Sequence, residues 1–173
     1  MTDAELAQRL KEVSVLKGSF TLRSGRHSNY IIDKYAFETR PELLTEIARR
    51  IVERLPAGIT RIAGVELGGV PLATAVSLQS GLPFVIVKKE RKGYGTDKAI
   101  EGALASGDTI VLVEDVATTG GGAIAAAEQL VAAGAKIVKV IGVVDREEGA
   151  VEGFKKAGFP FEALFTRTSL GIR

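Results

Sequence analysis

Two threonines and three glycines stand between an apolar run and an expected helix in the stretch VLVEDVATTGGGA, residues 111–123. Gly120, Gly121 and Gly122 free backbone N–H groups to wrap an anion, and the start of the following helix adds the positive end of its dipole. The hydroxyls of Thr118 and Thr119 are further hydrogen-bond donors. This spacing predicts a phosphate site at a strand-to-helix turn.

Two adjacent acids in the same stretch, Glu114 and Asp115, indicate what else the ligand carries. Two unit charges about 4 Å apart interact by roughly 4 kcal/mol at an effective dielectric of about 20, so carboxylates beside a pyrophosphate would repel it. Carboxylates accept hydrogen bonds from a ribose diol or hold a metal ion. We therefore expect a phosphorylated sugar whose hydroxyls face the acids and whose phosphate occupies the glycine loop.

Three other interpretations of this stretch are weaker. Gly120, Gly122 and Ala125 satisfy the G-x-G-x-x-A pattern of dinucleotide-binding loops, but the two acids argue against a pyrophosphate there. No G-x-x-x-x-G-K-[ST] sequence is present, which excludes the nucleotide-binding P-loop. The plainest alternative is a tight turn with solvated acids.

A second glycine pair precedes another expected helix, in VELGGVPLA, residues 65–73. Gly68 and Gly69 stand just before Pro71, a residue that favours the first turn of a helix, and form a second candidate anion nest. Two nests suit a ligand that has a phosphate group at each end.

A cationic segment, VKKERKGYGT at residues 87–96, lies between the two nests in the sequence. Four cations stand against two acids, Glu90 and the nearby Asp97. The cations are Lys88, Lys89, Arg91 and Lys92. Alone, such a segment is usually a solvated charged loop. Next to two anion nests it becomes a candidate lid that covers a pyrophosphate and excludes water.

Arginines mark two further places. Arg23 and Arg26 flank the expected tip of a hairpin in FTLRSGRHSNYIID, residues 20–33, and could simply be exposed turn cations. Asp145 and Arg146 end an apolar run, and the planar fork of arginine suits a carboxylate ligand. His27 is the only histidine and has no cysteine near it, so we expect a surface residue rather than a metal ligand.

The elements around these residues predict an α/β fold with a doubly wound, mostly parallel five-stranded sheet flanked by helices. The expected strands are rich in Val and Ile and span residues 62–66, 84–88, 109–114, 137–144 and 161–165. The expected helices between them span residues 71–79, 122–133 and 151–157, and residues 89–106 are expected to form a loop. Ligands of such sheets bind at the carboxyl ends of the strands.

The N-terminal part is expected to add a small helix and hairpin hood, residues 1–40, to a core of residues 41–173 within one domain. A capping box at Thr2 and Glu5 begins a first helix that ends near Gly18, and a second box at Thr39 and Glu42 begins a helix that Pro56 stops. The hairpin lies between these helices.

Composition limits the alternatives. The chain has 173 residues and a net charge of +2, too small for a generic binder of nucleic acid, and no apolar run approaches the roughly 20 residues of a membrane span. It has no cysteine, which excludes thiolate chemistry and disulfides. With no signal peptide at its start, the chain is expected to be cytoplasmic.

The acid, threonine and glycine stretch resembles the phosphoribosyl pyrophosphate (PRPP) signature of the type I phosphoribosyltransferases. VELGGVPLA, VKKERKGYGT and FTLRSGRHSNYIID resemble, in that order, the pyrophosphate loop, the mobile catalytic loop and the substrate hairpin of the orotate phosphoribosyltransferases. The resemblance implies transfer of a phosphoribosyl group from PRPP to orotate with Mg²⁺, held mainly by PRPP near Asp115. It also implies a homodimer in which the loop from Lys88 to Gly102 reaches the neighbouring active site.

The resemblance also implies roles for individual residues. PRPP contacts are expected at Arg23, Glu66, Leu67, Gly68, Gly69, Lys88, Lys89, Lys92, Tyr94, Glu114, Asp115, Val116, Ala117, Thr118, Thr119, Gly120, Gly121, Gly122 and Ala123. Orotate contacts are expected at Arg23, Tyr30, Ile31, Ile32, Thr118 and Arg146. The expected catalytic residues are Lys92, Lys89 and Asp115.

The chain departs from the family pattern at two positions, and two other functions are compatible with its sequence. Tyr94 stands where bacterial members often have a histidine, and the pyrophosphate loop lacks the lysine that some members carry near Gly68. The rivals are a phosphoribosyltransferase for another base and a non-catalytic regulator that senses PRPP. A regulator of transcription would need a nucleic-acid surface, and no long basic stripe is visible.

Overall fold

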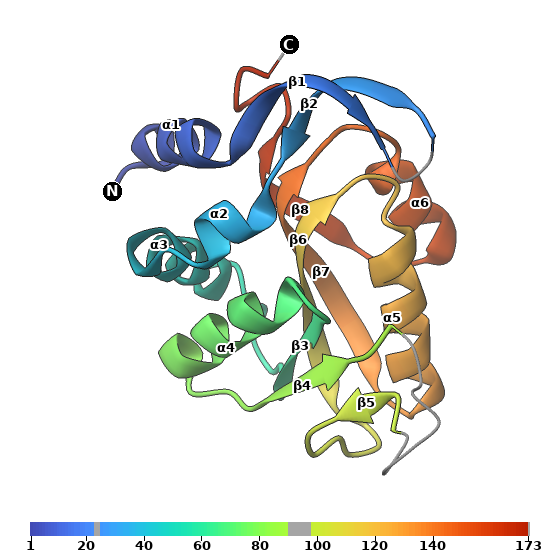
Figure 1. Ribbon diagram of the computed structural model, residues 1–173. Coiled ribbons are helices and arrows are strands. Elements are labelled where there is room, and N and C mark those ends of the chain that lie inside the picture. Colours follow the sequence, from blue (N-terminus) through green and yellow to red (C-terminus); the bar gives the residue numbers. More distant parts are fainter. Residues whose placement is uncertain (23–24, 90–97, 173) are drawn as a thin grey trace.

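The computed structural model describes residues 1–22, 25–89 and 98–172, and within them a six-stranded sheet forms the centre of the molecule (Figure 1). In spatial order its strands are β5 (Ile100–Glu101), β4 (Phe84–Val87), β3 (Arg61–Val65), β6 (Thr109–Ala117), β7 (Lys136–Asp145) and β8 (Phe161–Thr166). All neighbours pair in parallel except β5, which is antiparallel to β4. The expected mostly parallel sheet is confirmed.

The expected count of five strands is wrong by the edge strand β5. That strand has two residues in a segment expected to be a loop, too short to show an alternating pattern. A second difference concerns β6, which continues past the expected end at residue 114 to Ala117, because it pairs with β7 as far as Asp145. Both acids of the signature stretch therefore lie within the strand.

Helices cover both faces of the sheet because its central strands are apolar on both sides (Figure 1). Val111 and Val113 of β6 pack in one core cluster, and Ile110 and Leu112 pack in the other. The helices are α3 (Pro41–Val52) and α4 (Gly69–Ser80) on the first side and α5 (Gly121–Ala132) and α6 (Ala150–Ala157) on the second. Within the described residues, no helix has the length and apolar character needed to cross a membrane.

The N-terminal layer consists of α1 (Asp3–Ser14), β1 (Val15–Thr21), β2 (His27–Ile32) and α2 (Lys34–Glu38). The capping box of Thr2 and Glu5 is confirmed, and β1 and β2 form the expected antiparallel hairpin. The first helix ends at Ser14 rather than near Gly18, because Val15 already pairs with Ile32 of β2. Strand pairing here overrides the helical spacing.

The expected capping box at Thr39 and Glu42 is wrong. Helix α3 begins at Pro41 after Arg40 without a side-chain cap, and the hydroxyl of Thr39 instead donates to the backbone oxygen of Tyr35 at 2.6 Å. Thr39 closes α2, a five-residue helix that the sequence pattern does not reveal.

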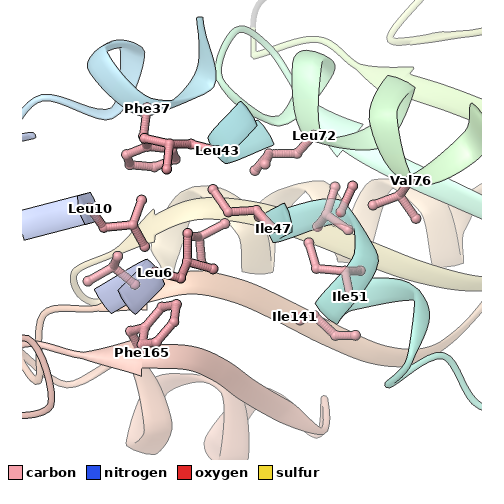
Figure 2. Packing of buried hydrophobic residues seen from close by; sticks show 14 of the residues in the cluster. Leu6, Leu10, Phe37, Leu43, Ile47, Ile51, Leu72, Val76, Ile141 and Phe165 are labelled. Carbon is pink, nitrogen blue, oxygen red and sulfur yellow. The ribbon is translucent and has the colours of Figure 1, made fainter. Parts of the chain in front are cut away.

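Buried side chains fix the N-terminal layer to the core. Figure 2 shows Leu6 and Leu10 of α1 packed with Phe37 of α2, Leu43 and Ile47 of α3, and Phe165 of β8. All six residues belong to one cluster, and Phe37 is fully buried. Phe37 therefore anchors α2 beside the carboxyl end of β6, where the signature acids stand.

Candidate active site

The carboxyl ends of β3, β6 and β7 lie side by side, so the loops that follow them meet at one edge of the sheet. Ala117 at the end of β6 is paired with Asp145 at the end of β7, and the backbone N–H of Arg146 donates to the oxygen of Ala117 at 2.9 Å. This register places Arg146 next to Thr118. The acid, threonine and glycine stretch and the arginine expected to contact orotate thus come from neighbouring strands.

The loop after β6 has the geometry of an anion nest. Gly120 has a φ of 80°, which favours glycine, and a Cβ at this position would lie 2.8 Å from the ring of Phe154. Gly121 and Gly122 form the first turn of α5 and are exposed, as are Thr118 and Thr119. Backbone donors and two hydroxyls therefore surround an open space at the positive end of a helix.

The apolar residues on either side of the threonines and glycines pack against the rest of the protein. Ala117 and Ala123 are buried and Val116 is half-buried, so their side chains pack while their backbone shapes the loop. Expected PRPP contacts at these three positions would be made by main-chain atoms.

The two acids of β6 differ in their surroundings. Burial, and next the negative charge of Asp115, raise the pKa of Glu114 to about 8, so this carboxyl is largely neutral near pH 7. Asp115 is almost fully buried: its Oδ1 accepts from the backbone of Val116 at 2.5 Å, and its Oδ2 lies 2.6 Å from the ammonium of Lys34. Each oxygen keeps acceptor capacity for a further hydroxyl.

The loop after β3 packs directly against Asp115. A Cβ added to Gly68 would lie 1.8 Å from Oδ2 of Asp115, so only glycine allows this approach. Gly69 packs against β3, and Leu67 is largely exposed. The peptide bond between Glu66 and Leu67 is cis, and the side chain of Glu66 accepts from the backbone of Lys89 at 2.6 Å. The second predicted nest therefore packs directly on a signature acid.

A second pocket lies between the hairpin and the end of β7. It is a cavity of about 390 Å³ lined by Leu22, Arg26, His27, Ser28, Asn29, Tyr30, Arg146, Glu148 and Arg167. The guanidinium of Arg146 lies 4.7 Å from the ring centre of Tyr30, and its Nε lies 2.9 Å from Glu148. Glu148 also pairs with Arg26 at 2.6 Å. This cationic pocket with one aromatic wall suits a flat anionic ring.

The expectations for Ile31 and Ile32 are not supported in the same way. Ile31 follows Tyr30 directly and therefore points to the opposite face of β2, and neither Ile31 nor Ile32 is among the residues that line the cavity. Ile32 packs against the first core cluster instead.

The loop lysines are only partly described. Arg23, Lys92 and Tyr94 lie outside the described residues. The ammonium of Lys88 pairs with Glu101 of β5 at 3.0 Å, pointing toward the edge strand rather than the acids. The positive charge of Lys89 offsets a small part of the rise in the pKa of Glu114.

Sequence reasoning missed Lys34, Glu38 and Glu148. The first two lie on the short helix α2, about 80 residues before Asp115 in the chain. Glu148 lies in the turn that follows β7, next to the predicted Asp145 and Arg146. Its position two residues after Arg146 was the available signal.

The carboxylates of Asp115 and Glu114 suit a metal ion that arrives bound to the substrate better than one bound by protein ligands alone. Within the described ranges, no group of three or more His, Cys, Asp or Glu side chains could hold a metal ion. Mg²⁺ commonly binds through one or two carboxylates together with substrate phosphates and water. The oxygens of Asp115 and Glu114 beside two anion nests fit that arrangement.

Comparison with known proteins gives consistent matches along the chain. Residues 36–161 match the family model described as a phosphoribosyl transferase domain. The orotate phosphoribosyltransferase of Methanocella arvoryzae is 46% identical over 169 residues, which cover 97% of this chain and 97% of that protein. That of Pyrococcus horikoshii is 46% identical over 167 residues, covering 95% of this chain and 90% of that protein.

Solved structures agree in fold. The orotate phosphoribosyltransferase of Mycobacterium tuberculosis in complex with PRPP has 30% identity and a TM-score of 0.83, covering 98% of this chain and 99% of that chain. That of Aeropyrum pernix has 32% identity and a TM-score of 0.83, covering 95% of each chain. Adenine phosphoribosyltransferase from Leishmania donovani, at 23% identity and a TM-score of 0.74, covers 95% of this chain and 80% of its own and shares the fold alone.

Proposed function

The chain belongs to the orotate phosphoribosyltransferase family of type I phosphoribosyltransferases, and we propose that it converts orotate and PRPP to orotidine 5′-monophosphate and pyrophosphate for UMP biosynthesis. The observation that carries this proposal is the pairing of Ala117 with Asp145 at the ends of β6 and β7. This pairing sets the candidate phosphoribosyl loop beside Arg146 and its cationic pocket.

The proposed ligand positions follow from the chemistry of each loop. The 5′-phosphate of PRPP binds the N–H groups and hydroxyls of residues 118–122, and the ribose diol donates to Asp115 and Glu114. The pyrophosphate lies over Gly68 and Gly69. Orotate stacks in the pocket of Tyr30 and Arg146, where arginine meets an anionic ring.

The reaction under this proposal is a displacement at the anomeric carbon of the ribose. The bond from that carbon to the pyrophosphate oxygen breaks through an oxocarbenium-like transition state while the bond to the ring nitrogen of orotate forms. The proton of that nitrogen leaves with the pyrophosphate. The residues of this chain contribute by holding both reactants in line and by neutralising the leaving group. Lys92 and Lys89 are the proposed cations for the leaving pyrophosphate.

Magnesium fits this arrangement as part of the substrate complex. A bound Mg²⁺ would neutralise pyrophosphate charge, and Asp115 and Glu114 would hold the hydroxyls or waters bound to it. We also propose that the chain acts as one domain in a homodimer, with the segment from Lys88 to Gly102 serving the neighbouring site.

The proposed function is tested by following the loss of orotate absorbance after PRPP and Mg²⁺ are added, beside parallel reactions with uracil, hypoxanthine, adenine and guanine. We expect turnover of orotate alone, and none in EDTA. Turnover of another base would overturn the proposed role of the Arg146 pocket. Binding of PRPP without turnover of any base would instead favour a regulator.

A further inference from the structure

Lys34, on the short helix α2, reaches the proposed PRPP site from the N-terminal layer. Its ammonium lies 2.6 Å from Oδ2 of Asp115, and its side chain is 28% exposed. The helix is held in place at both ends: the side chain of Asp33 accepts from the backbone of Tyr35 at 3.1 Å, and Phe37 is buried in the first core cluster. The position of Lys34 is thus built into the fold.

The surroundings of this lysine are acidic. One turn further along α2, Glu38 is 3% exposed, and neither of its carboxyl oxygens has a hydrogen-bond partner among the described residues. A Cβ on Gly68 would lie 2.9 Å from Oε1 of Glu38 and 1.8 Å from Oδ2 of Asp115. Both carboxyls therefore lie directly beneath the loop proposed to carry the pyrophosphate.

The pyrophosphate loop cannot supply a cation at this point. Any side chain at Gly68 would collide with Asp115, and the charged residue of residues 66–69 is the acid Glu66. Lys34 acts on three acids of the site, Asp115, Glu38 and Glu114. It pairs with Asp115, and its positive charge works against the raised pKa of Glu38 and of Glu114.

We propose that Lys34 is a positioning residue for PRPP: it fixes the carboxylate of Asp115 for the ribose diol and offsets the negative charge of that carboxylate beneath the pyrophosphate. The inference rests on the proposed function, since it assigns the diol to Asp115. With Oδ2 held by Lys34 and Oδ1 by the backbone of Val116, the carboxylate has one orientation and free lone pairs for two hydroxyls. Without the ammonium, the polyanionic PRPP approaches the uncompensated charge of Asp115.

The test is calorimetric titration of the whole protein with PRPP and Mg²⁺, without orotate, on wild type, Lys34→Met and Lys34→Arg. Lys139→Met is the matched control, because Lys139 is 26% exposed, pairs with Glu162 at 3.1 Å, and lies on the part of β7 away from the site. We expect Lys34→Met to raise the Kd for PRPP about tenfold, the effect of losing one charge-assisted contact. Lys34→Arg should stay within about threefold of wild type, and Lys139→Met should not change.

Steady-state kinetics on the same proteins separate positioning from general damage. We expect the KM for PRPP to rise in Lys34→Met while the KM for orotate stays unchanged. Wild-type affinity in Lys34→Met would overturn the inference, and so would equal weakening in Lys34→Arg, which keeps the charge. If Lys34→Met does not fold, the comparison of wild type with Lys34→Arg and Lys34→Gln decides in the same way. Failure of wild type to use orotate would refute the proposed function but leave the PRPP titration valid.

Discussion

Glu38 makes the stability of this protein depend on pH in an unusual direction. Its carboxyl is buried without a hydrogen-bond partner in the described structure, and burial, followed by the charge of Asp115, raises its pKa to about 8 from an ordinary value of 4.5. The folded state therefore keeps a proton that the unfolded chain loses. Its contribution to stability is fully present below pH 4.5 and is lost as the pH rises toward 8.

The size of the effect follows from the number of protons involved. Where the folded carboxyl is protonated and the unfolded one is not, the free energy of unfolding falls by about 1.4 kcal/mol per pH unit for each such group. Glu114, whose pKa burial also raises to about 8, adds a second group. We expect wild type to lose roughly 5 kcal/mol between pH 5.5 and 7.5, and Glu38→Gln to lose about half of that.

Urea unfolding at pH 5.5, 6.5 and 7.5, followed by circular dichroism, measures these slopes. Glu128→Gln, at an exposed position of α5, controls for the removal of one acid. If Glu38→Gln and wild type instead lose stability in parallel over this range, the buried carboxyl of Glu38 is already ionised in the folded protein, which contradicts the prediction.

Five substitutions test the site itself. Gly68→Ala should lower the melting temperature and weaken PRPP binding, because its methyl group would lie 1.8 Å from Oδ2 of Asp115 and overpacking costs about 1 to 3 kcal/mol. In the same melting assay Gly122→Ala, whose Cβ meets no atom within 4 Å, should be neutral or stabilising; equal losses in the two would contradict the clash. Asp115→Asn should raise the calorimetric Kd for PRPP about tenfold, and a normal titration would remove Asp115 from the ribose site. Arg146→Lys should raise the KM for orotate about tenfold with the KM for PRPP unchanged, since lysine lacks the planar fork over Tyr30; parallel changes in both constants would count against the pocket. Lys92→Ala should lower kcat by about a hundredfold while PRPP affinity changes little. An unchanged rate constant in single-turnover assays would contradict its proposed role.

The central sheet was predictable because its strands carry their own signal. The Val- and Ile-rich runs before Glu114 and before Asp145 indicate burial on both faces of a sheet, and the observed strands β6 and β7 contain these runs. The glycines of both nests were also readable, because positive φ at Gly120 and close approach at Gly68 each demand that residue type.

Long-range contacts were beyond the sequence pattern. Helix α2 has five residues, too few for a helical period, and the pairing of Lys34 with Asp115 joins segments about 80 residues apart. The same limit applies to the first helix, where Val15 leaves the helical spacing because Ile32 pairs with it. Glu148 was adjacent to a predicted site residue, but only the folded turn shows that it holds both Arg26 and Arg146.

A crystal structure of the protein with bound orotidine 5′-monophosphate is the most direct test of the proposed ligand positions, because that product carries the phosphate, the ribose and the base together. We predict its phosphate in the loop of residues 118–122, its ribose hydroxyls on Asp115 and its base in the pocket lined by Tyr30 and Arg146. A base bound away from Arg146, or a phosphate bound at Gly68 instead, would contradict the proposed arrangement of the site.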